Sequence, residues 1–91
     1  ISHWHGDHVL GLPGVMQSLS ASEYSKTLEI FGPKGTKERV NKMFDVFVFD
    51  NKVDYKAHEI KKKGFYDSKN YWLEALELDH RIKCFGFNFI E

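Results

Sequence analysis

A dense group of metal-binding side chains near the start of the sequence constrains the fold more than any other feature. The group reads H-x-H-x-D-H and comprises His3, His5, Asp7 and His8. Neutral imidazole and carboxylate are ligands of borderline divalent metals, zinc above all. His3 and His5 are two residues apart, so both point the same way if the segment is extended. Asp7 and His8 follow Gly6, where the chain can turn. The fold must therefore hold two ligand pairs side by side, an arrangement that suits two adjacent metal ions.

Four ligands do not fill two metal sites, because a catalytic zinc normally has three protein ligands and one open position. The best candidate for a further ligand is His80, which ends an extended run just before Arg81 and so lies at a strand-to-turn junction. A surface histidine in a hairpin is the alternative for His80, and spacing alone does not decide between the two. For His58, which stands apart from the cluster, we favour a purely polar role.

A first amphipathic helix is predicted from about Leu12 to about Ser22, with Pro13 in the first turn, where helices tolerate proline. Its apolar residues follow the spacing i, i+3, i+4, i+7, which predicts a buried face made of Leu12, Val15, Met16 and Leu19. The apolar run from Leu28 to Phe31 stops at Gly32 and Pro33, a pattern typical of a buried strand that leads into a turn.

A second amphipathic helix is predicted to begin at Gly35 or Thr36 and to end near Asp50 and Asn51. Glu38 lies in its first turn, where a negative charge suits the helix dipole. The same helical spacing predicts a second buried face, made of Val40, Met43, Phe44 and Phe47.

The remainder of the chain favours strands. Residues 52–69 have no clear period and predict only short strands and loops. Leu76, Leu78 and His80 share one face of an extended segment, and the later strand alternates Phe85, Phe87 and Phe89 with smaller or polar residues. Helices and strands together predict an α/β fold.

Composition allows one small domain or part of one, since the chain has 91 residues and 42% hydrophobic content. Thirteen basic residues balance thirteen acidic ones, so net charge indicates neither nucleic-acid binding nor membrane adhesion. The single cysteine, Cys84, cannot form an internal disulfide, and no apolar run reaches the roughly 18 residues of a membrane span. We therefore expect a cytoplasmic protein without membrane partners. Because the chain starts at Ile1 and stops within a strand pattern, we also expect it to be an excerpt of a longer one.

Several stretches together resemble one known family. H-x-H-x-D-H is the signature of the metallo-β-lactamase superfamily, and SHWHGDHVLGLPG is similar to its ribonuclease Z branch. IFGPKGTKE, from Ile30 to Glu38, resembles the strand-turn-helix segment of that branch. LDHRIKCFGFNFIE, from Leu78 to Glu91, resembles its third metal motif and the aromatic strand that follows. The resemblance spans nearly the whole chain.

The resemblance implies a zinc-dependent endoribonuclease that removes the 3′ trailer from precursor tRNA and leaves a 3′-hydroxyl on the tRNA. Carried over residue by residue, it makes His3, His5 and His80 the ligands of one zinc ion. It makes Asp7 and His8 part of a second zinc site, with Asp7 also the general base. The implied fold is a partial αββα sandwich, with residues 1–91 as part of one domain truncated at both ends, and the implied full-length form is a homodimer.

The family also needs a bridging aspartate and two further histidines that this chain does not contain, so we expect the chain to be inactive alone. Two alternatives stay open. One is another hydrolase of the same superfamily, such as a phosphodiesterase or an arylsulfatase. The other is a non-catalytic half that binds tRNA or mediates dimerisation, although the intact H-x-H-x-D-H argues against a half that has lost its ligands.

Overall fold

The computed structural model describes residues 1–91 except 48–52, 62, 68–70, 79 and 91. Its elements, in chain order, are α1 (Gly6–Val9), α2 (Leu12–Ala21), β1 (Leu28–Pro33), α3 (Thr36–Val46), β2 (Tyr55–Ile60), β3 (Lys63–Asp67), β4 (Trp72–Leu78) and β5 (Cys84–Ile90). None of the described helices is long and apolar enough to cross a membrane. The mixture of helices and strands confirms the α/β class.

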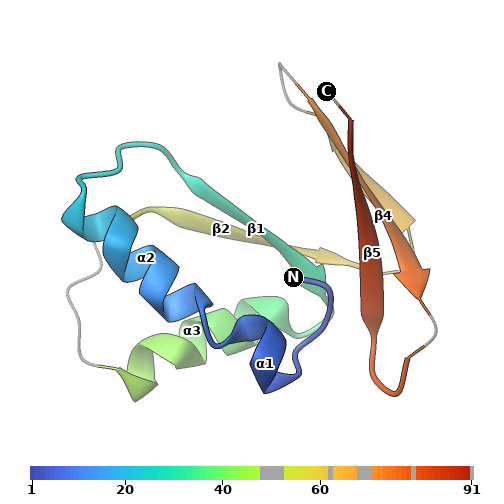
Figure 1. The fold of residues 1–91 in the computed structure, drawn as a ribbon, viewed down its shortest axis with the longest axis horizontal. Helices are drawn as coiled ribbons and strands as arrows, with labels where there is room; N and C mark the ends of the chain where they lie inside the picture. The colour runs from blue at the N-terminus through green and yellow to red at the C-terminus, as the bar shows by residue number, and fades with distance from the viewer. Residues whose placement is uncertain (48–52, 62, 68–70, 79, 91) are drawn as a thin grey trace.

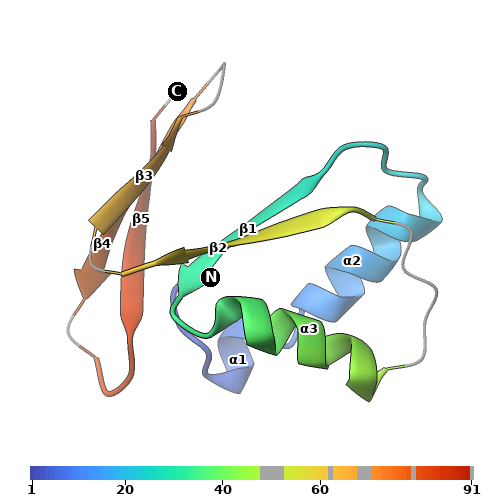
Figure 2. The ribbon, with the colours of Figure 1, turned by 180° about the vertical axis from the view of Figure 1, so that it is seen from behind.

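The strands form two sheets, and all three helices lie on one side of the first sheet (Figures 1 and 2). β1 and β2 pair in parallel, with Phe31 opposite His58, and α3 makes the crossover that a parallel pair requires. β3, β4 and β5 form an antiparallel sheet in that order. The start of the chain lies between β1 and β5, where the two sheets meet.

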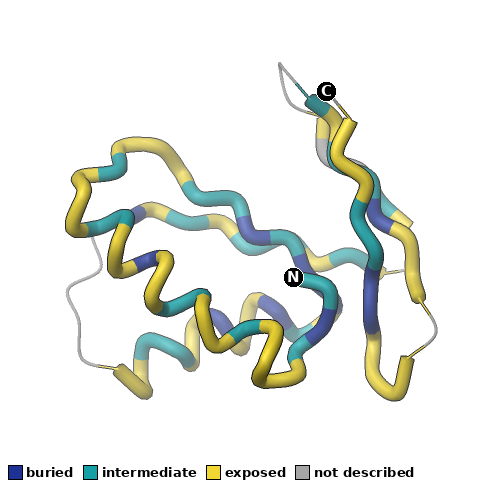
Figure 3. Tube along the Cα trace, in the orientation of Figure 1, coloured by how far each residue is buried: buried dark blue, intermediate teal, exposed yellow. Residues whose placement is uncertain are grey.

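The main core lies between the helices and the β1–β2 sheet. Its buried centre takes one side chain from each of three elements, namely Met16 of α2, Ile30 of β1 and Val40 of α3. Figure 3 shows a buried segment on each of these three elements. The side chains packed around this centre are Ile1, Trp4, Leu12, Leu28, Met43, Phe44 and Tyr55. The core therefore reaches the start of the chain, where the histidine cluster begins.

The two predicted helix faces are confirmed except at one residue of each, Val15 and Phe47. Met16 and Val40 are fully buried, but Val15 is 51% exposed and Phe47 is 49% exposed. The other members of the two faces are half-buried, and Leu12, Met43 and Phe44 pack against the buried core. The second helix also ends at Val46, with Phe47 already extended, which is earlier than the predicted end near residues 50 and 51. Those two residues lie outside the described part of the chain.

Burial along β5 follows position along the strand and not the predicted alternation. Cys84 and Phe85 are both buried, Phe87 is half-buried and Phe89 is 64% exposed. The first residues of β5 contact the start of the chain, since the backbone N–H of Phe85 donates to the carbonyl of Ser2 at 2.8 Å. The far end of β5 extends away from that contact (Figure 1).

The unequal burial on α2 gives a direct test of the core. Replacing the buried Met16 with alanine is expected to lower the free energy of unfolding by about 2–5 kcal/mol, because it removes packed side-chain atoms and leaves a cavity. Replacing the exposed Val15 with alanine is expected to change it by less than about 0.5 kcal/mol. Urea unfolding followed by circular dichroism measures both variants. Equal losses would mean that α2 presents a different face to the sheet.

Candidate metal centre

Backbone hydrogen bonds on both sides fix the segment that leads into the histidine cluster. The backbone nitrogen of Ile1 donates to the carbonyl of Phe31 in β1 at 2.7 Å. On the other side, the N–H of Phe85 in β5 donates to the carbonyl of Ser2 at 2.8 Å. Residues 1 and 2 therefore connect the two sheets, and His3 directly follows them. This local geometry places His3 in the interior, with 5% of its surface exposed.

Three histidines converge beside this junction. One ligand atom from each of His3, His5 and His80 lies within 4.8 Å of the other two. The ring of His80 is 4.6 Å from that of His3 and 5.2 Å from that of His5, measured between centroids. This convergence was predicted from the sequence and is confirmed. His80 lies between β4 and β5, so the hairpin at the edge of the antiparallel sheet brings it to the N-terminal histidines.

The donor set fits a zinc ion. Zinc–nitrogen bonds of about 2.0–2.1 Å in a tetrahedral site place ligand nitrogens roughly 3.4 Å apart. The ligand nitrogens of the three histidines lie up to 4.8 Å apart, which is farther than this. Since His5 and His80 are exposed, their side chains have room to rotate toward His3. His3 is buried and therefore serves as the fixed member of the group.

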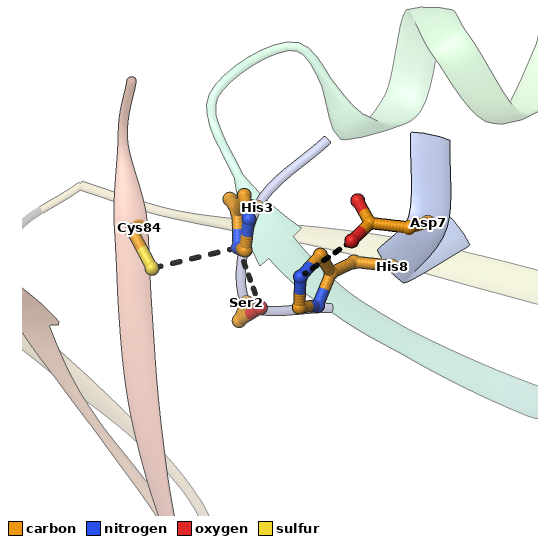
Figure 4. Close-up of polar contacts among 5 residues, drawn as sticks. All are labelled: Ser2, His3, Asp7, His8 and Cys84. Carbon is orange, nitrogen blue, oxygen red and sulfur yellow. Dashed lines mark hydrogen bonds and ion pairs between the residues drawn. The ribbon is translucent and has the colours of Figure 1, made fainter. Parts of the chain in front are cut away.

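Asp7 and His8 form a pair next to the three histidines. Helix α1 begins after His5, and the N–H of His8 donates to the carbonyl of His5 at 2.9 Å. This turn brings the ring of His8 to 4.1 Å from that of His3. The Asp7 carboxylate lies 3.5 Å from Nε2 of His8, and both side chains are open to solvent (Figure 4). Within the described residues, no other group of three histidine, cysteine or acidic side chains is close enough to hold an ion.

The surroundings of His3 favour the neutral imidazole. Burial lowers the pKa of His3 below its ordinary value of 6.5, and the neighbouring rings of His8, His80 and His5 add to this effect, while Asp7 opposes it. Neutral imidazole is the form that binds a metal ion. The lowered pKa of His3 therefore favours the form of the side chain that is able to bind a metal ion.

Two side chains on the inner edge of His3 were not identified from the sequence. Nδ1 of His3 lies 2.8 Å from Oγ of Ser2 and 3.6 Å from Sγ of Cys84, which approach it from the chain start and from β5 (Figure 4). A hydrogen bond at one ring nitrogen fixes the orientation of the ring and directs the other nitrogen outward. Ser2 is a sequence neighbour of His3, but nothing in the sequence around Cys84 indicates a contact 81 residues away.

Comparisons with known proteins give one consistent result for sequence and fold. No protein-family model matches the chain. The chain is 42% identical to ribonuclease Z of Pediococcus pentosaceus over 90 residues, covering 96% of the chain and 29% of that relative. It is 37% identical to ribonuclease Z of Nanoarchaeum equitans over 91 residues, covering the whole chain and 28% of that relative. The chain thus spans about three tenths of the curated relatives that it matches.

Solved structures agree with the sequence matches. The crystal structure of the short form of human tRNase Z superposes on the whole chain with a TM-score of 0.84 at 27% identity, and the match covers 42% of that structure. The metallo-β-lactamase fold protein YhfI of Bacillus subtilis matches 97% of the chain and 34% of its own length, with a TM-score of 0.63 at 20% identity, which supports the fold alone. Along its whole length, the chain is therefore similar to a segment of ribonuclease Z, and it has the α/β fold of the corresponding part of a metallo-β-lactamase domain.

Proposed function

We propose that this chain is part of a metal-dependent endoribonuclease that removes the 3′ trailer from precursor tRNA. The observation that carries the proposal is the convergence of His3, His5 and His80 beside the Asp7–His8 pair. The similarity to ribonuclease Z along the whole chain supports the substrate class. Because the chain spans about three tenths of those relatives, we also propose that residues 1–91 are part of one domain, truncated at both ends. The whole protein is then the form that acts on tRNA.

The residues divide into three roles in this proposal. His3, His5 and His80 hold one zinc ion, and Asp7 and His8 supply ligands for a second. Bound zinc supplies Lewis acidity, which lowers the pKa of water and offsets negative charge at the reacting phosphodiester. The carboxylate of Asp7 accepts the proton of the attacking water, as a general base. The exposure of Asp7 supports this role, because its oxygens are open to water and to a substrate from outside.

Ser2 and Cys84 support His3 from the inner side. With Nδ1 of His3 directed at the hydroxyl of Ser2, Nε2 is the nitrogen available to the ion. The ring then donates its Nδ1 proton to the oxygen of Ser2. This hydrogen bond holds the tautomer that a metal ligand needs.

A second zinc site requires more than Asp7 and His8. The resemblance implies a bridging aspartate and a histidine for that site, and a further histidine that protonates the leaving group. We propose that all three come from parts of the whole protein outside the 91 residues. A non-catalytic half is disfavoured, since such a half has no need to keep the histidines in convergent positions.

Two further expectations belong to the same proposal. We propose that the whole protein is cytoplasmic, supported by the one free cysteine, and that it forms a homodimer, supported by the resemblance alone. Cell fractionation tests the first expectation. Light scattering of the purified whole protein tests the second, and a monomer mass at micromolar concentration would contradict it.

The experiment that tests the function uses a precursor tRNA with a labelled 3′ trailer and the whole protein with zinc. We expect release of the intact trailer and complete loss of cleavage after chelation. Bis(p-nitrophenyl) phosphate, assayed in parallel, tests the alternative of a general phosphodiesterase. Hydrolysis of this small diester with no release of the trailer would overturn the proposed substrate.

A further inference from the structure

Trp4 lies between His3 and His5 in the sequence, and its side chain is hydrogen-bonded to the first residue of α3. Its indole Nε1 donates a hydrogen bond to Oγ1 of Thr36 at 2.9 Å. The hydroxyl of Thr36 in turn donates to the carbonyl of Pro33 at 2.7 Å. Thr36 is fully buried, so neither bond competes with water. The single hydroxyl thus accepts one bond and donates the other, and it joins Trp4 to the turn between β1 and α3.

The turn is shaped to receive this hydroxyl. A Cβ atom at Gly32 would lie 2.4 Å from Oγ1 of Thr36, so a side chain at that position would displace the hydroxyl. Gly35 takes a positive φ of 97° and directs the chain into α3, where Thr36 is the first residue. The two glycines therefore fix the position of the acceptor that Trp4 uses.

A cation also contacts the indole of Trp4. The guanidinium carbon of Arg39 lies 5.8 Å from the ring centroid, within the range of a cation–π contact. Arg39 is on the first turns of α3, the helix that Thr36 begins. The same helix therefore holds Trp4 both at its N–H and at its ring.

We propose that Trp4 is a positioning residue, which fixes the backbone between His3 and His5 against the start of α3 and so presets their relative orientation. His5 needs such support because it is exposed, and packing alone does little to orient its ring. His3 is already held by burial and by Ser2. Because one peptide bond joins Trp4 to His3 and another joins it to His5, fixing Trp4 restrains the backbone of the exposed His5 relative to the buried His3. This inference rests on the proposed role of both histidines as metal ligands.

The test measures zinc affinity of the whole protein by competition with a chromophoric chelator. Trp4→Phe keeps a ring but removes the donor, and Thr36→Val removes the hydroxyl with little change in shape. Each is expected to weaken zinc binding about 10-fold, as losses of outer-shell partners do, and the double variant no more than either alone. Thr36→Ser keeps the hydroxyl and should restore most of the affinity. Trp72→Phe is the matched control, because Trp72 is 56% exposed on β4.

A second readout separates positioning from folding. The visible spectrum of the cobalt-substituted protein reports ligand geometry and should change in Trp4→Phe but not in Trp72→Phe. A Trp4→Phe protein that is less stable to urea, yet has unchanged zinc affinity and cobalt spectrum, would overturn the inference and leave the proposed function intact. Absence of zinc binding by the unaltered protein would instead overturn the proposed function and, with it, this inference.

Discussion

Cleavage of precursor tRNA by the whole protein is expected to fall about 10²- to 10⁴-fold when Asp7 is replaced with alanine. The replacement removes the proposed general base and leaves His8 without its nearest carboxylate, which lies 3.5 Å from Nε2. It should leave the fold unchanged, because the Asp7 side chain is 81% exposed. Rates of trailer release under single-turnover conditions measure the effect on the chemical step directly.

The 91-residue chain alone is expected to release no trailer and to bind zinc weakly. Its three histidines can hold one ion, but among the described residues only Asp7 and His8 lie beside them as ligands for a second. We therefore expect that the described residues do not complete the metal pair that the proposed reaction needs. The same labelled precursor tRNA, incubated with zinc or manganese and either form of the protein, compares the chain with the whole protein.

Asp45→Ala in the whole protein is the matched control for Asp7→Ala, since Asp45 is an exposed carboxylate on α3, away from the histidine cluster. It should cleave at the unaltered rate. Trailer release by the 91-residue chain at a rate near that of the whole protein would contradict the claim that it is incomplete. Equal rates for Asp7→Ala and Asp45→Ala would exclude Asp7 as the base.

The candidate metal ligands could be predicted from the sequence because metal ligands follow strict chemistry and spacing. His3, His5, Asp7 and His8 lie within six residues of one another, and their residue types alone indicate a metal. His80 required one more step, from the end of a strand pattern to the edge of a sheet, and the structure confirms that it joins His3.

The inner support of the site could not be predicted, because it depends on contacts between distant segments. Cys84 meets His3 across 81 residues, and Trp4 meets Thr36 across 32. Neither pair has a characteristic spacing, since each forms only after the sheets and helices have packed. Local patterns therefore predict the candidate ligands better than the long-range contacts that surround them.

The fold was predictable to the extent that periodicity determines it. Helical spacing predicted α2 and α3 and their buried centres, Met16 and Val40. The pattern did not show that α3 ends at Val46, and so Phe47, which follows the helix, was wrongly expected to be buried. Val15 was also wrongly expected to be buried. The burial of β5 likewise depends on the segment at residues 1–2 that covers one of its ends, which no property of the strand itself reveals.

Replacing His80 with alanine is expected to produce the largest loss of zinc affinity among single substitutions outside the H-x-H-x-D-H motif. His80 is the third member of the only described group that can hold an ion, so its loss leaves two ligands where three are needed. The loss should exceed the roughly 10- to 100-fold that follows removal of an outer-shell partner. Competition with a chromophoric chelator measures the affinity of the whole protein, and metal analysis after dialysis gives the number of ions retained.

His58→Ala is the matched control, because it removes the same side chain from a different place. His58 lies on β2, where it pairs with Glu29 and stacks on the ring of Phe31, 4.6 Å between centroids. Its loss can weaken the β1–β2 sheet but removes no member of the histidine group, so zinc affinity should stay unchanged even if the protein unfolds at lower urea. If His80→Ala retained full affinity, the convergence of the three rings would be a packing contact, and the ion would require ligands from elsewhere in the protein. If both variants lost affinity equally, the effect would come from the fold and not from a lost ligand.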